Sequence, residues 1–148
     1  MHSKPIVVKA ICLVTNDRNE LLVSEDYDSV KKEYFCVPLG GHVRYNERSV
    51  DTVKREFLEE INAELINIEL ITVLENFFEW NGEHYHEINF VYKGELADKS
   101  LYHKHDIPFL DPKYSNAKVK WINPEDFKNG KHVLYPEGLR EIVLVKSI

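Results

Sequence analysis

The stretch "GHVRYNERSVDTVKREFLEEINA", residues 41–63, contains the helix around which we expect the fold to be arranged. Its apolar residues recur at helical spacing and form one stripe: Val50, Val53, Phe57 and Ile61. A stripe of this kind predicts a helix that packs on a sheet. We expect Ser49 to cap the start of the helix and Asn62 to end it in a left-handed conformation.

The same helix carries a cluster of carboxylates. Glu56, Glu59 and Glu60 fall within an arc of about 100° beside the apolar stripe, because each residue advances about 100° around the axis. Three carboxylates this close either share a divalent cation or lose charge by protonation. Ligand sets made only of oxygen favour Mg²⁺ or Mn²⁺. Taken alone, however, such a charge run is more commonly a solvated helix face.

Length and composition limit the class of protein. The chain has 148 residues, 43% of them hydrophobic, which suits a single soluble domain over residues 1–148. The net charge is −6 and no run of Lys and Arg occurs, which argues against binding to a nucleic-acid duplex or an acidic membrane. No stretch approaches the roughly 18 apolar residues of a membrane span. We therefore expect a cytoplasmic protein.

The two cysteines, Cys12 and Cys36, both lie in apolar stretches. This placement predicts two buried thiols in a reducing compartment. Their spacing matches no metal or redox motif.

The remaining segments alternate between strand and turn patterns. Residues 4–14 and 21–24 are expected to pair as a hairpin around the turn at 15–20. The dipeptide Asn81–Gly82 predicts a second hairpin between two long apolar runs. Strands before and after a central helix, with short helices near the C-terminus, indicate an α/β fold with a mixed sheet between helices.

The spacing of polar residues in this stretch is more specific than a charge run. Gly41 is followed after five residues by Glu47, after seven more by Arg55–Glu56, and after two more by Glu59–Glu60. Six such identities coincide by chance about once in ten million start positions. The pattern resembles the Nudix box, here residues 41–63, and the chain is similar to the Nudix hydrolase family. We call this stretch the box.

This resemblance implies a Nudix α/β/α sandwich and a pyrophosphohydrolase that depends on Mg²⁺ or Mn²⁺. Its substrate would be a small nucleotide-type molecule, either a nucleoside diphosphate derivative or a nucleoside triphosphate. Asn62 stands where the family has Gly, and Asn can adopt the same backbone conformation. A noncatalytic module that senses nucleotides is the alternative function. A homodimer is compatible with an open edge of the sheet.

The resemblance also implies roles for individual residues. Four would hold the metal: Glu56, Glu59, Glu60 and, through its carbonyl, Gly40. Arg55 would orient either Glu56 or Glu47 through a bidentate ion pair. The base that takes a proton from the attacking water would be Glu59 or Glu60 within the box, or Glu87 outside it.

Residues that could contact the substrate are more weakly indicated. Arg44 lies in the box loop, where a cation could meet a phosphate, and His86 could touch phosphate from a strand. Several aromatic side chains could stack on a base, although packing is the commoner role of aromatic residues at strand ends: Tyr45, Phe78, Trp80 and Tyr85. The long segment 97–116 is expected to be functional or mobile.

Overall fold

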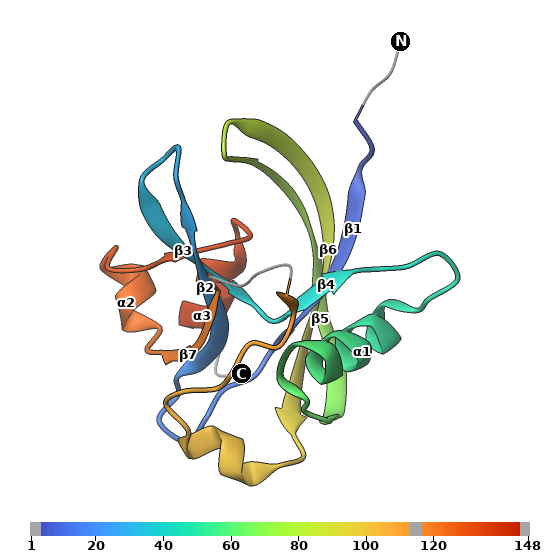
Figure 1. Cartoon of the computed structure of the whole chain (residues 1–148), viewed down its shortest axis with the longest axis vertical. Helices are drawn as coiled ribbons and strands as arrows, with labels where there is room; N and C mark the ends of the chain where they lie inside the picture. Colours follow the sequence, from blue (N-terminus) through green and yellow to red (C-terminus); the bar gives the residue numbers. More distant parts are fainter. Residues whose placement is uncertain (1–3, 113–116, 146–148) are drawn as a thin grey trace.

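The computed structural model describes residues 4–112 and 117–145. Figure 1 shows helix α1 (Ser49–Ile61) on one side of the molecule and helices α2 (Glu125–Lys128) and α3 (Leu139–Val145) on the other. The strands between them form two four-stranded sheets. The α/β class and the mixed strand pairing are confirmed, and the strands divide into two sheets instead of forming one.

The first sheet has the order β4-β1-β6-β5. Its strands are β4 (Gly40–His42), β1 (Val7–Leu13), β6 (Glu83–Leu96) and β5 (Leu65–Trp80). Strand β1 runs parallel to β6 and antiparallel to β4. The predicted turn at Asn81–Gly82 joins β5 to β6, and both turn residues have positive φ angles, as a tight hairpin requires.

The second sheet has the order β7-β2-β3-β8. Its strands are β7 (Lys118–Ile122), β2 (Leu21–Asp28), β3 (Glu33–Pro38) and β8 (Val133–Leu134). The predicted hairpin of residues 4–14 with 21–24 is wrong, because β1 and β2 belong to different sheets and share only a bridge between Thr15 and Leu21. Both strands are buried over consecutive residues, which is typical of strands covered on both faces that take their partners from other segments.

Helix α1 docks on the first sheet through its predicted stripe. Val53 and Phe57 are fully buried against Ala10 and Cys12 of β1. The helix is capped by Arg48, whose backbone carbonyl accepts from the first turn, and not by Ser49. The Ser49 hydroxyl is instead hydrogen-bonded to the hydroxyl of Tyr92.

The C-terminal end of α1 follows the prediction, and the segment after β6 is anchored beside it. Asn62 adopts the left-handed conformation, with φ 53° and ψ 42°. The 3-10 helix η1 (Lys99–His103) follows β6, and the backbone N–H of Leu110 donates to the carbonyl of Glu60 at 2.8 Å. The described part of segment 97–116 is therefore attached to the helix that carries the box. Both cysteines are buried and free, as predicted. None of the described helices is long and apolar enough to cross a bilayer.

Candidate active site

The guanidinium group of Arg55 organises the box by contacting three carboxylates. Its Nε and Nη2 atoms lie 2.8 and 3.0 Å from the two carboxylate oxygens of Glu47. Its Nη1 lies 2.8 Å from Glu56 Oε1 and 3.2 Å from Glu59 Oε2, and Nη2 also donates to the carbonyl of His42 at 3.0 Å. The bidentate partner of Arg55 is thus Glu47, and the remaining nitrogen holds the two helix glutamates.

Glu47 is held as an ionised anchor. Besides Arg55, it accepts hydrogen bonds from the Thr52 hydroxyl at 2.7 Å and from the backbone N–H of Arg44 at 3.1 Å. The bonds from Arg55, aided by those from Thr52 and Arg44, lower the pKa of Glu47 to about 2. Its place in the site is therefore structural, since it fixes the arginine that positions the other carboxylates.

Glu60 is the buried carboxylate of the cluster, with 5% of its surface exposed. Its Oε1 accepts from the backbone N–H of Gly40 at 3.1 Å. Burial, followed by the negative charges of Glu56 and Asp111, raises the pKa of Glu60 to about 9. Without a cation this group holds a proton at neutral pH, so the site favours the arrival of positive charge.

Glu56 lies against bare backbone at Gly41. Burial raises the pKa of Glu56, although Arg55 opposes this shift. A Cβ atom at Gly41 would lie 2.5 Å from the Glu56 carboxyl carbon, which is closer than real contacts allow. The absence of a side chain at Gly41 therefore makes room for the carboxylate.

We expect Gly41→Ala to weaken divalent-metal binding and hydrolysis by about tenfold or more, because a displacement of about 1 Å in a catalytic group carries a large cost. Isothermal titration with Mn²⁺ measures the first effect. Gly82→Ala, in the turn between β5 and β6, controls for backbone strain alone, since its φ is +81° but a Cβ atom there meets no atom within 4 Å. Equal Mn²⁺ affinity in wild type and Gly41→Ala would contradict this role for Gly41.

The donor set fits a hard divalent cation. Three carboxylates, from Glu47, Glu56 and Glu59, surround the guanidinium of Arg55, the buried Glu60 carboxylate lies beyond them, and Arg44 adds a contact of 3.7 Å to Glu59. Negative charge is thus in excess, and every candidate side-chain ligand is an oxygen. Glu56, Glu59 and Glu60 could hold Mg²⁺ or Mn²⁺. The carbonyl of Gly40 stays a predicted ligand.

A cavity of about 270 Å³ lies between the two sheets and opens onto the box. Gly40, Gly41 and Glu60 line one end of it. Glu87 also lines the cavity, is 4% exposed, and forms an ion pair of 2.7 Å with Lys9. The predicted outside candidate therefore shares a cavity with the box and already has a cationic partner.

The other end of the cavity is aromatic. Five rings line it: Phe35, Phe78, Trp80, Tyr85 and Tyr135. A sixth ring of the cavity, Phe109, precedes Leu110, whose N–H is bonded to the carbonyl of Glu60. Phe78 stacks on Tyr85 with ring centroids 5.0 Å apart, and Phe78 also contacts Tyr135 at 6.3 Å. We call these five residues the aromatic cluster. It offers flat apolar surfaces of the kind on which a heteroaromatic base stacks.

The aromatic end also carries two polar atoms without partners. Asn76 and Trp80 both line the cavity. Among the described residues, Asn76 Oδ1 and Trp80 Nε1 are buried and form no hydrogen bond. Buried polar groups are rarely left unsatisfied, so an unpaired acceptor and an unpaired donor in one cavity point to a ligand that supplies both.

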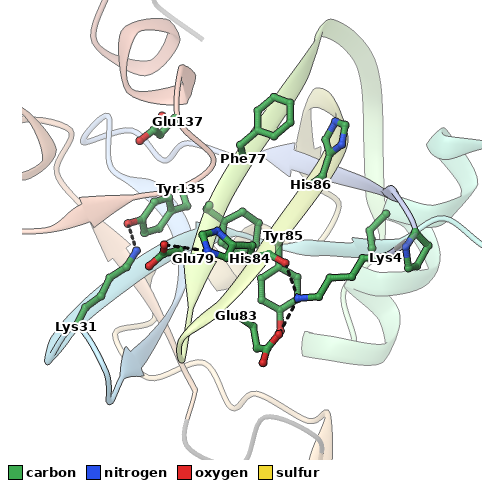
Figure 2. Close-up of a pocket in the computed structure, with 13 residues that line it drawn as sticks. Lys4, Lys31, Phe77, Glu79, Glu83, His84, Tyr85, His86, Tyr135 and Glu137 are labelled. Carbon is green, nitrogen blue, oxygen red and sulfur yellow. Dashed lines mark hydrogen bonds and ion pairs between the residues drawn. The ribbon is translucent and has the colours of Figure 1, made fainter. Parts of the chain in front are cut away.

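A larger outer groove of about 930 Å³ adjoins the aromatic end and shares Phe78, Tyr85 and Tyr135 with the cavity. Figure 2 shows Lys31 reaching the hydroxyl of Tyr135, and Lys4 reaching Glu83. No box residue lines this groove. We therefore locate the site in the cavity between the sheets.

Two predicted substrate residues lie away from the cavity. The side chain of Tyr45 is 93% exposed. His86 stacks on Phe77 at 4.2 Å, and both rings lie on one surface of the β5–β6 hairpin (Figure 2). Register explains this, because Phe77 and His86 are cross-strand partners and point away from the face that carries Phe78 and Tyr85.

Sequence reasoning missed two features of this site. Asp111 lies close enough to raise the pKa of both Glu56 and Glu60. Asn76 and Asn89 line the cavity from β5 and β6. Asparagines in otherwise apolar strands were the sequence signal that could have identified Asn76 and Asn89. The sequence held no comparable signal for Asp111, since segment 97–116 shows no helical or strand pattern near this residue.

Comparison with known proteins agrees with this geometry. The NUDIX domain family matches residues 5–142 of the chain. A NUDIX hydrolase from Nitrosomonas europaea superposes with a TM-score of 0.65 at 15% identity, covering 95% of this chain and 87% of that one. A MutT NUDIX hydrolase from Burkholderia pseudomallei gives 0.64 at 17% identity, covering 98% and 100%. No curated protein matches. The chain belongs to the Nudix hydrolase family.

Proposed function

We propose that this Nudix hydrolase is a Mg²⁺- or Mn²⁺-dependent pyrophosphohydrolase of a small nucleotide-type substrate. As a member of its family, it acts on phosphoric anhydride bonds. One observation carries the finer proposal: a single cavity joins the buried carboxylate of Glu60 to the aromatic cluster. A molecule with a diphosphate at one end and a base at the other matches this distribution of charge and apolar surface.

At the box end of the cavity, different carboxylates would retain the metal and accept the proton from water. Bound Mg²⁺ would neutralise charge on the diphosphate and lower the pKa of a water. Glu56 and Glu59, held by Arg55, would retain the cation. Glu60 Oε1 is occupied by the N–H of Gly40, so Oε2 is the atom that would take the proton from water. Burial raises the pKa of Glu60, which makes this carboxylate a stronger base once it is ionised.

At the aromatic end, the unpaired atoms favour a base that presents both a donor and an acceptor. Asn76 Oδ1 would accept from the base, and Trp80 Nε1 would donate to it. Rings of the aromatic cluster would stack on the flat faces. These contacts bind substrate and product alike, so they are expected to set KM more than kcat.

We expect Trp80→Phe to raise KM about tenfold with little change in kcat, because it keeps a ring but removes the N–H donor. Steady-state kinetics on the best substrate measures this. Trp121→Phe is the matched control, since Trp121 is the only other tryptophan and its Nε1 donates to the Leu101 carbonyl at 3.3 Å, outside the cavity. Unchanged KM in Trp80→Phe, or an equal rise in both variants, would argue against this contact.

The substrate is tested with a panel of nucleoside triphosphates, sugar nucleotides, dinucleoside polyphosphates and ADP-ribose-like compounds, each with Mg²⁺ and with Mn²⁺. We expect turnover of one class, with release of a nucleotide product. Tight binding of a panel member without any turnover would favour the nucleotide-sensing module instead. Tryptophan fluorescence of Trp121→Phe reports binding separately, since Trp80 is then the only indole.

We also propose that the protein is cytoplasmic and that it forms a homodimer. Free buried thiols at Cys12 and Cys36 suit the reducing cytoplasm, where we place the protein. Strand β5 is a terminal strand of the first sheet and exposes Leu70, Val73 and Phe77. An edge of this kind supports a homodimer, which sedimentation velocity would test.

A further inference from the structure

A second cluster of potential ligands lies in the other sheet, away from the box. Glu25 of β2 and Cys36 of β3 are directly opposite each other across an antiparallel pair. Side chains alternate along strands, so these two occupy the face opposite that of their neighbours Ser24 and Phe35, which line the cavity. The cluster is therefore separate from the proposed substrate site.

The third member of the cluster is His132, which follows α2 and precedes β8. Its backbone N–H donates to the carbonyl of Asp126 at 2.9 Å, which fixes the turn. Its Nδ1 lies 3.4 Å from Glu25 Oε2, and Cys36 Sγ lies 4.0 Å from the same oxygen. All three ligand atoms lie within 4.8 Å of one another.

These separations approach those of a filled site. Zinc binds sulfur at about 2.3 Å and nitrogen or oxygen at about 2.0–2.2 Å in a tetrahedron, which puts ligand atoms about 3.3–3.6 Å apart. Small rotations of the side chains of Cys36 and His132 would close the difference. The backbone needs no rearrangement, because strand pairing already fixes Glu25 against Cys36.

Two charged side chains next to the cluster orient its potential ligands. His132 Nε2 lies 4.0 Å from Asp126 Oδ2, so a carboxylate faces the ring nitrogen that would not bind metal. Metal-binding histidines usually have such a partner, which orients the ring. On the other side, Lys120 Nζ lies 2.7 Å from Glu25 Oε1 and leaves Oε2 directed at the cluster.

We propose that Glu25, Cys36 and His132 form a second metal site, specific for a borderline-soft divalent cation such as Zn²⁺. A thiol, an imidazole and a carboxylate are together typical of zinc, whereas Mg²⁺ prefers oxygen alone. With three protein ligands, the fourth position would be filled by water. The site does not depend on the proposed hydrolase function, since it shares no residue with the box or the cavity.

The charges balance when the metal binds. Binding requires the Cys36 thiol to lose its proton to solvent, because the thiolate is the ligand. The thiolate and the carboxylates of Glu25 and Asp126 then carry three negative charges, and Lys120 with a divalent ion carries three positive ones. One proton is released for each ion bound.

The site is tested with Co²⁺, which replaces Zn²⁺ and gives a thiolate-to-metal charge-transfer absorption. We expect this band on titration of the metal-free full chain, together with displacement by Zn²⁺. Cys36→Ser is expected to abolish the band. Cys12→Ser is the matched control and should keep it, because Cys12 packs in the other hydrophobic cluster and its Sγ donates to the Leu13 carbonyl at 3.9 Å.

Two further variants separate coordination from folding. Asp126→Asn should weaken Co²⁺ affinity by about 10- to 100-fold while the band remains, as loss of an orienting partner predicts. Glu56→Gln should leave the band unchanged, because it alters only the box. Absence of the band in folded wild type, its survival in Cys36→Ser, or its loss in Cys12→Ser or in Glu56→Gln would overturn the proposal.

Discussion

Glu60→Gln is expected to lower metal-dependent hydrolysis by about 10²- to 10⁴-fold, the range typical of a lost general base. The amide keeps the size and the hydrogen bond from the Gly40 N–H, but it can neither carry negative charge toward a metal nor take a proton from water. Kinetics under saturating Mg²⁺ measures the effect on kcat. The matched control is Glu64→Gln, because Glu64 is exposed just beyond the helix. Activity within a few-fold of wild type in Glu60→Gln would contradict the role assigned to this residue.

The same variant has a second expected effect, on stability. In the folded chain burial raises the pKa of Glu60 to about 9, above its ordinary value of 4.5, so the folded state binds the proton more tightly than the unfolded state. This contribution to the free energy of unfolding is complete below about pH 4.5 and is lost as the pH rises toward 9. The slope is at most about 1.4 kcal/mol per pH unit.

Urea denaturation in EDTA between pH 5 and pH 9 tests this linkage. We expect wild type to lose stability with rising pH, and Glu60→Gln to lose less and to be the more stable of the two at pH 8. Mg²⁺ should reverse the wild-type loss, because a cation stabilises the ionised carboxylate. Parallel pH profiles for wild type and Glu60→Gln would show that Glu60 is not the group that titrates.

Arg55→Lys is expected to have the second-largest effect, because a lysine carries the charge without the planar fork. Arg55 bonds both oxygens of Glu47, one of Glu56 and the His42 carbonyl, and a single ammonium cannot reach all of them. We expect a loss of about 10²-fold in kcat/KM. We also expect a loss of about 1–3 kcal/mol in stability, since partners of the guanidinium are left unsatisfied.

The control for this substitution is Arg48→Lys, since Arg48 is exposed and caps α1 only through its backbone. Mn²⁺ affinity, measured by titration, should fall in Arg55→Lys and stay constant in Arg48→Lys. Equal affinities in the two variants would show that Arg55 does not position the metal ligands.

Local sequence patterns predicted the helix and the positions of its carboxylates well, because both features depend on residues that are close in sequence. The stripe through Val53 and Phe57 is buried as the 3.6-residue period requires, and Asn62 ends the helix as its left-handed preference indicates. The pairing of β1 and β2 was not predictable in the same way. A turn between two apolar runs indicates a hairpin locally. In the structure β1 pairs instead with β4 and β6, which are distant from it in sequence.

The parts of the site that depend on strand register also escaped sequence reasoning. Tyr85 and His86 are neighbours in β6, yet Tyr85 lines the cavity and His86 does not, since the face of a strand decides which side chain points inward. Likewise, Glu25, Cys36 and His132 are far apart in sequence and meet only through the pairing of β2 with β3 and the turn after α2. Spacing rules for metal motifs cannot find such a cluster.

Hydrolysis at the box carboxylates is tested most directly by the Mg²⁺ dependence of turnover at pH 8, measured on the best substrate of the panel. Wild type, Glu60→Gln and Glu64→Gln would be compared with and without EDTA. The geometry predicts that wild type and Glu64→Gln turn over with Mg²⁺ and stop in EDTA, and that Glu60→Gln turns over about 10²- to 10⁴-fold more slowly with Mg²⁺ and also stops in EDTA. Turnover that persists in EDTA, or that is equal in Glu60→Gln and wild type, would contradict hydrolysis at the box carboxylates.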